Sequence, residues 1–233
     1  MKNLTSLALL WLLALAAPAL AQTAPETRTV AAFHALEVSS GIELHLTASP
    51  TQLVQASADT PELLAHIKTE VSNGVLKVSF ERREGERWGP NNFHLRVNVA
   101  APPLDALRAS SGATIDVPGP YAIDQLKLDL SSGAILTADL NSKAVEAQVS
   151  SGGLATLTGT IQRLAISASS GGIFKGLNLK AVACDATASS GGIITVAVQE
   201  SLTAEASSGG NVHYRGSPQV TKHTSSGGSV SSR

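Results

Sequence analysis

The sequence predicts an all-β fold of the parallel β-solenoid class, in which the chain coils into stacked rungs. Three observations carry this prediction. The tripeptide Ser-Ser-Gly recurs eight times, apolar and polar residues alternate around it, and turn residues come too often to leave room for long helices. An antiparallel β-sandwich is the alternative fold, but a nearly fixed spacing over many copies favours the solenoid.

The spacing of the Ser-Ser-Gly copies sets the length of the repeating unit. The copies begin at positions 39, 110, 131, 150, 169, 189, 207 and 225. From position 110 onward they are separated by 21, 19, 19, 20, 18 and 18 residues. One unit of about 19 residues is too small to bury an apolar face alone, so neighbouring units must cover each other.

The residues before each copy alternate with the period of a β-strand. Ahead of Ser150, for example, Ala147 and Val149 are apolar and Gln148 between them is polar. This order predicts a strand with one buried face. A second strand begins after the glycine, and a second turn is then predicted at a nearly fixed offset. The residues of that turn are Gly119, Asn141, Gly159, Asn178 and Gly216.

The Ser-Ser-Gly copies themselves are interpreted as corners between strands. Glycine reaches positive φ without steric cost, and a small serine keeps the corner narrow. The serines are therefore assigned a structural role. The corner residues are Ser131, Ser132, Gly133, Ser150, Ser151, Gly152, Ser169, Ser170, Gly171, Ser189, Ser190, Gly191, Ser207, Ser208 and Gly209.

Residues 1–21 have the pattern of a secretory signal peptide. Lys2 supplies a positive start, residues 4–17 are largely apolar, and Ala19 to Ala21 form an A-x-A cleavage site. The rest of the chain is therefore expected to be exported. Basic and acidic residues nearly balance, 17 against 18, which argues against nucleic-acid binding. Cys184 is the only cysteine, so the fold cannot depend on an internal disulfide.

The predicted order along the chain is a flexible segment at 22–29 and one solenoid domain at 30–232. Within that domain, residues 30–103 form an N-terminal lobe that caps the solenoid, and residues 104–232 form the repeated rungs. Residues 33–46 match the repeat and predict a first rung. The polar repeat near the C-terminus predicts either a cap or a frayed rung.

The middle of the lobe departs from the repeat. A strand is predicted at 52–57, followed by a short helix through about Thr69, with Thr60 as its N-cap and Pro61 at its first position. Residues 75–80 and 93–99 predict a hairpin with a long charged tip between them.

Together, the pattern F-x-x-L-x-V-S-S-G-I-x-L from Phe33, the lobe and the tandem SSGG-I/L rungs resemble a known family. It is the "putative auto-transporter adhesin head GIN domain", a bacterial exported domain, and the resemblance covers about residues 30–215. It implies a right-handed β-helix and an envelope or surface location. No segment after Arg233 could form a translocating barrel, so a periplasmic location is expected before a secreted or cell-surface one.

Enzymatic function finds little support in the sequence. Parallel β-helices host polysaccharide lyases and hydrolases, which need clustered carboxylates. Glu146 and Asp185 are predicted to share one outward column, and Asp129 and Glu205 another, but the members of each pair stand two or more rungs apart. We therefore predict no catalytic residues. A carbohydrate-active β-helix enzyme remains the alternative, as does an envelope-stress sensor or scaffold.

Metal and cofactor binding are also not predicted. The histidines show no metal-ligand spacing. Calcium between stacked turns would need acidic residues in the corners, and the Ser-Ser-Gly corners have none. Cys184 occupies an inward position and is predicted to be a small core residue.

Binding is the function class that remains, so an adhesin-like interaction module is expected. The predicted hairpin tip is one candidate contact, because it joins a tryptophan to several arginines. Its residues are Arg82, Arg83, Arg87 and Trp88. The other candidate is the flat polar face of the rungs. The expected partner is an envelope or surface protein or a polysaccharide, with no nucleic acid and no membrane span.

Overall fold

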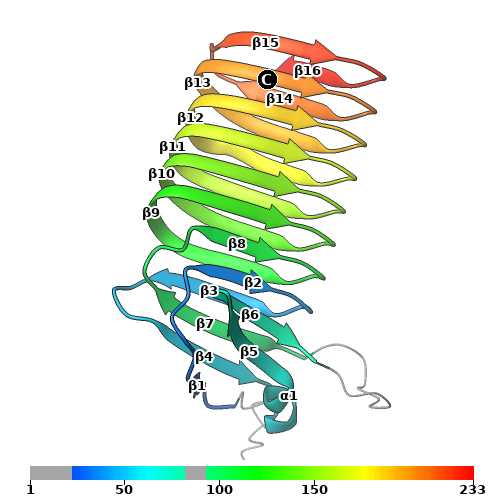
Figure 1. Cartoon of the computed structure of the whole chain (residues 1–233). Helices are drawn as coiled ribbons and strands as arrows, with labels where there is room; N and C mark the ends of the chain where they lie inside the picture. Colours follow the sequence, from blue (N-terminus) through cyan, green and yellow to red (C-terminus); the bar gives the residue numbers. More distant parts are fainter. Residues whose placement is uncertain (1–22, 82–92) are drawn as a thin grey trace, which may run out of the picture.

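The computed structural model describes residues 23–81 and 93–233, so the predicted signal peptide and hairpin tip lie outside the described residues. The fold is an all-β solenoid of about 7 turns, with 67% of residues in strands and a spacing of about 19 residues. It winds as a right-handed coil (Figure 1). The predicted fold class is confirmed.

Each regular rung is one long strand that covers both sides of the coil. These strands are β9 (Thr114–Leu130), β10 (Ile135–Val149), β11 (Leu154–Ala168), β12 (Ile173–Ala188) and β13 (Ile193–Ala206). Each pairs in parallel with the next. We call the side formed by their first halves the post-corner face and the side formed by their second halves the pre-corner face.

In the regular rungs the predicted second turn is a bend within a continuous strand, so the prediction is wrong there, whereas the predicted turn at Gly216 does separate two strands. The ladder continues through the bend with register shifts, for example between Ala138 and Asp139. Such irregularities let a paired strand change direction without ending. A rung therefore has one tight corner and one broad bend, which form the pointed and the rounded sides in Figure 1.

The Ser-Ser-Gly corner is a type I′ turn, because both central residues have positive φ. Ser151 has φ 49° and Gly152 has φ 74°. The Gly153 N–H donates to the Ser150 carbonyl at 2.8 Å and closes the turn. The Gly152 N–H donates to the Ser170 carbonyl of the next rung at 3.2 Å. The positive φ of the glycine is confirmed, whereas the positive φ of the second serine was not predicted.

A second glycine follows many of these corners for a different reason. Gly172 is buried, and a Cβ there would lie 2.2 Å from the carbonyl oxygen of Val149 in the preceding rung. Its role is therefore to let two backbones approach closely. The same close approach to the preceding rung recurs at Gly192, Gly210 and Gly228.

The predicted hairpin is not a hairpin. Strand β6 (Val75–Phe80) pairs in parallel with β2 (Ala35–Val38), whereas β7 (Leu95–Ala101) pairs in parallel with β3 (Glu43–Ala48). β6 and β7 thus lie on opposite faces and form one rung below the β2–β3 rung. The sequence between these two strands contains no Ser-Ser-Gly, which is why the repeat pattern did not reveal this rung.

Antiparallel strands close the lower end of the coil. β4 (Leu53–Ala58) covers the edge of β7, and β5 (Ile67–Ser72) covers the edge of β6. β1 (Glu26–Arg28) pairs with β4 and lies within the segment 22–29. Covered edges cannot pair with other chains, as expected for a capping lobe.

The helix α1 (Pro61–His66) joins β4 to β5. The predicted cap is confirmed, since the Thr60 hydroxyl accepts from the Leu63 N–H at 3.3 Å. The helix is shorter than predicted because Ile67 already has an extended backbone and begins β5. The alternation from Ile67 to Val71 is the strand signal that the prediction missed.

At the upper end, β14 (Asn211–Arg215) and β15 (Gln219–Thr224) pair with β13 and form the last full rung. β16 (Ser229–Ser232) pairs with β14 and adds a further half rung. All six residues of β15 are exposed. Lys222 pairs with Ala204 and so continues an inward column that is apolar in every other rung. The polar repeat at the C-terminus is thus a paired rung.

The lobe and the solenoid are joined at β8 (Ala106–Ala109), which pairs with both β2 and β9. Tyr121 is buried beside this junction, and its hydroxyl accepts a hydrogen bond from the Leu104 N–H at 2.6 Å. Burial raises the pKa of Tyr121, so the phenol stays protonated at neutral pH.

The variant Tyr121→Phe is expected to lose about 1–3 kcal/mol of stability, because the buried Leu104 N–H would lose its partner. Urea unfolding measures the loss. The same change at the half-buried Tyr214 serves as the control and should have little effect. Equal stabilities for the two variants would contradict the role of this bond.

Candidate functional site

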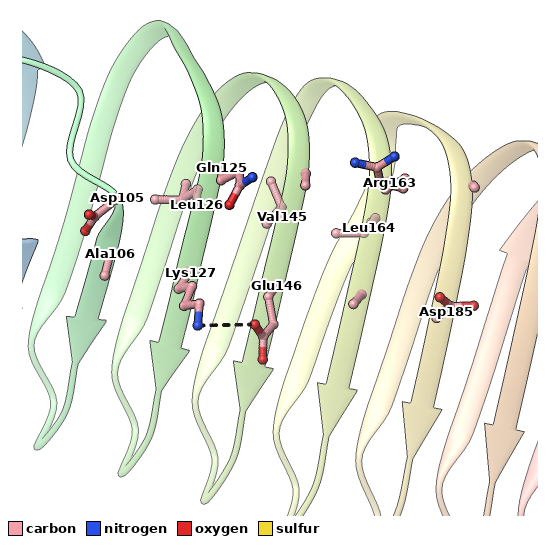
Figure 2. A pocket seen from close by; sticks show the side chains of 13 residues that line it. Asp105, Ala106, Gln125, Leu126, Lys127, Val145, Glu146, Arg163, Leu164 and Asp185 are labelled. Atoms are coloured by element: carbon pink, nitrogen blue, oxygen red, sulfur yellow. Dashed lines mark ion pairs between the residues drawn. The ribbon is translucent and has the colours of Figure 1, made fainter.

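The candidate site is a groove of about 670 Å³ on the pre-corner face. It runs along the solenoid axis from β8 to β12, across the second halves of the strands (Figure 2). Because each strand contributes side chains at matching positions, the groove is built from columns of residues stacked one rung apart.

Two outward columns border the groove. One contains Ala106, Lys127, Glu146, Ala165 and Asp185, which are direct partners in the ladders from β8 to β12. The other lies two residues earlier on each strand. Its members are Gln125, Ala144, Arg163 and Ala183. The alanines leave the space between the longer side chains open.

The charges of the groove alternate in sign along the axis. Successive strands bring Asp105, Lys127, Glu146, Arg163 and Asp185 to the groove, where Asp105 directly precedes β8. The Lys127 ammonium lies 3.9 Å from a Glu146 carboxylate oxygen, with both side chains more than half exposed. Such exposed pairs contribute about 0–1 kcal/mol to stability, so these charges remain free to meet a partner.

The ends of this charge series differ in their contacts. Asp105 lies 3.1 Å from the Nδ1 atom of His34, with both side chains exposed. Within the described residues, no ion pair engages Arg163 or Asp185. Two charges of opposite sign therefore stand unpaired at one end of the groove.

The columns predicted from the sequence are confirmed. Glu146 and Asp185 lie in one column, separated by Ala165. Asp129 and Glu205 lie in the neighbouring column, where Gln148, Ser167 and Thr187 occupy the three rungs between them. Of these four acids, only Glu146 and Asp185 line the groove.

Other groove residues were missed by the sequence reading. Lys127 and Arg163 stand in different columns, and Asp105 lies just before its strand. Comparing the residues of one column at a time cannot reveal that the sign of the charge alternates from rung to rung. Aligning the charges of all outward positions rung by rung would have shown it. The other predicted contact, Arg82, Arg83, Arg87 and Trp88, lies outside the described residues.

The groove offers no metal centre. Among the described residues, no group of three or more His, Cys, Asp or Glu side chains is placed to hold a metal ion. The residues that line the groove also include no aromatic side chain. A partner in the groove would therefore contact charged side chains, the amide of Gln125 and small apolar side chains.

Cys184 lies beneath the groove in an inward column, between Leu164 and Leu202. It is 3% exposed, as its predicted role as a core residue requires. Burial, and secondly the charge of Asp185, raise the pKa of Cys184 to about 12. The thiol is therefore protonated at any pH below this value.

We expect Cys184 to be unreactive in the folded protein. Thiol reagents attack the thiolate, which a pKa of about 12 makes scarce at pH 8, and the atom is also shielded from solvent. Titration with a chromogenic disulfide reagent at pH 8 should show less than a tenth of a thiol per chain within an hour, and one thiol in urea. Rapid reaction without denaturant would contradict this burial.

Comparison with known proteins places the chain in a family. The model of the family described as "Putative auto-transporter adhesin, head GIN domain" matches residues 32–218. The chain belongs to this family. No curated protein sequence matches the chain significantly.

Several solved structures share the fold. A putative adhesin from Bacteroides fragilis has a TM-score of 0.78 at 19% identity, covering 93% of this chain and 99% of its own. A putative adhesin from Parabacteroides distasonis has a TM-score of 0.70 at 19% identity, covering 91% and 97%.

A third solved structure carries a different description. It is a putative lipid binding protein from Parabacteroides distasonis, with a TM-score of 0.65 at 17% identity, covering 90% of this chain and 96% of its own. At these identities the likeness concerns the fold alone.

Membership of an adhesin family indicates an extracellular or envelope protein. Within residues 23–81 and 93–233, no helix has the length and hydropathy needed to cross a membrane.

Proposed function

We propose that this protein is a non-enzymatic exported protein of the cell envelope, with the periplasm as its location, and that it acts as an adhesin-like binding module. The groove on the pre-corner face is its contact surface. The observation that carries this proposal is the alternating row of exposed charges, which a rigid stack of paired strands holds at fixed spacing. Membership of the GIN family supports it.

A protein suits this groove better than a polysaccharide. Sugar-binding platforms commonly stack the sugar rings on aromatic side chains, and the groove lining has none. Fixed charges of both signs instead favour a partner that carries complementary charges, because such patterns select a partner and set its register.

One observation favours the enzymatic alternative. Glu146 and Asp185 line the same groove, as paired carboxylates of a polysaccharide lyase or hydrolase would. Both are exposed, however, and Glu146 lies beside Lys127. If the protein released oligosaccharides from envelope or plant polysaccharides, and Glu146→Gln or Asp185→Asn abolished the release, the non-enzymatic assignment would be overturned.

Photo-crosslinking in living cells tests the proposed contact surface. A photoreactive residue at Ala165 reports on the groove, and one at Thr156 on the same strand reports on the post-corner face as the matched control. We expect a crosslinked protein from position 165 alone, in the periplasmic or envelope fraction after cell fractionation. Equal crosslinking from both positions, or none from 165, would refute the groove as the contact surface.

A further inference from the structure

We propose that the groove binds the groove of a second copy of this chain, with the two solenoid axes antiparallel. This inference rests on the proposed function, because it names the partner of the same contact surface. The adhesin-like module would then be homophilic, binding another copy of itself.

The first argument is the spacing of the charges. Neighbouring rungs of a parallel sheet lie about 4.8 Å apart, so the charged positions of the groove recur with that period. An extended peptide repeats its same-side residues about every 6.7 Å and would lose about 2 Å of register at each charge. A second stack of rungs has the same period and therefore stays in register from one rung to the next.

The second argument is the order of the charges. Asp105, Lys127, Glu146, Arg163 and Asp185 alternate in sign from rung to rung, so a reversed copy of the series that is shifted by one rung sets opposite charges against each other. A two-fold axis along the strands places equal columns opposite each other and reverses the order of the rungs. In that register Lys127 faces Glu146 of the second copy, Arg163 faces the region of Asp105, and Asp185 lies beyond the paired charges. Each pair occurs twice, because a two-fold interface is self-complementary.

The third argument is the placement of the small side chains. In the same register Ala165 lies opposite Ala106 of the second copy, and Gln125 lies opposite Ala144. Alanine therefore faces alanine in the first pair, and in the second pair the long glutamine side chain faces an alanine that leaves room for it. The two sheets could then approach to the roughly 10 Å at which β-sheet faces pack.

Association through exposed charges should depend strongly on salt. Charges separated by more than about 10 Å are largely screened at 0.1 M ionic strength, and exposed ion pairs lose much of their attraction. We expect a dimer in sedimentation experiments at about 20 mM ionic strength, with the dissociation constant raised at least tenfold in 0.5 M NaCl.

Charge reversal provides the decisive test. The K127E variant carries acids at both positions of the central pair, and the E146K variant carries lysines at both. Each variant alone would place like charges opposite each other and should sediment as a monomer. In an equimolar mixture each acid of one chain faces a lysine of the other, so a heterodimer should form. The ion pair between Lys127 and Glu146 of the same chain cannot explain a heterodimer, because mixing two variants does not restore that pair within either chain.

The matched control makes the same charge changes on the opposite face. T156E and T156K should dimerise as the unmodified protein does, and circular dichroism establishes that all four variants are folded. The inference is refuted if the mixture of K127E and E146K stays monomeric, or if either variant alone still dimerises.

The crosslinking at Ala165 separates this inference from the proposed function. A product with twice the mass of the chain and only its own peptides supports both. A product that contains a different protein, together with monomers in sedimentation, overturns the homophilic contact and leaves the proposed function standing.

Discussion

Replacing Phe174 with Ala is expected to cost about 4 kcal/mol of stability, because it would empty the largest side-chain volume in its column. Phe174 is 0% exposed, and in its inward column the preceding rung contributes the much smaller Ala155. The ring also lies over Gly176, where a Cβ would come within 2.8 Å of Phe174 Cε1. Phe174 therefore fills the space that two small neighbours leave open.

Urea unfolding monitored by circular dichroism measures this loss. Phe174→Leu is the control and should cost only about 1–2 kcal/mol, since it keeps most of the buried volume. If Phe174→Ala were no less stable than Phe174→Leu, the column would not be packed as described.

Replacing Gly172 with Ala should cost about 3 kcal/mol, because one methyl group would press against the backbone of the preceding rung. The new Cβ would lie 2.2 Å from the Val149 carbonyl oxygen and 2.6 Å from the carbonyl carbon. These are main-chain atoms held in a parallel ladder, so the clash cannot be relieved by rotating a side chain.

The neighbouring residue isolates the steric part of this cost. Gly171 has φ 72°, but a Cβ there would meet nothing within 4 Å. Gly171→Ala should therefore cost only about 1–2 kcal/mol, the penalty for a left-handed backbone. Gly153→Ala should fall between the two, since its Cβ would lie 2.9 Å from the Leu130 oxygen. Equal melting temperatures for Gly171→Ala and Gly172→Ala would contradict the close approach of the rungs.

The regular rungs could be predicted from the sequence because one signal repeats many times. The alternation of Ala147, Gln148 and Val149 recurs at a nearly fixed distance from each corner, and local patterns of that kind determine which side chains are buried. The lobe lacks this repetition. Nothing local reveals that β6 pairs with β2 rather than with β7, since strand pairing depends on contacts between distant segments.

The corners show a second limit of the prediction. Glycine is the expected residue at positive φ, but Ser151 and its equivalents adopt that backbone as well. A type I′ turn needs positive φ at both central positions, and the ladder between neighbouring corners holds the serine there. The hydrogen bonds between neighbouring rungs thus outweigh the preference of serine for a negative φ.

The groove could be predicted only in part. The shared column of Glu146 and Asp185 follows from the repeat. The alternation of charge does not, because it joins residues from two columns and one residue outside the strands. Only the stacked structure shows that Lys127 and Arg163 fall between the acids along one groove.

A protein built from interchangeable rungs must also avoid growing into a filament. The edge of β15 is such a risk, since its exposed backbone could accept a strand from another molecule. Lys222 stands at the inward position of this strand, so an added rung would have to enclose an ammonium group with which no described residue forms an ion pair. One lysine thereby limits the length of the stack, while the flat faces remain available for lateral contacts.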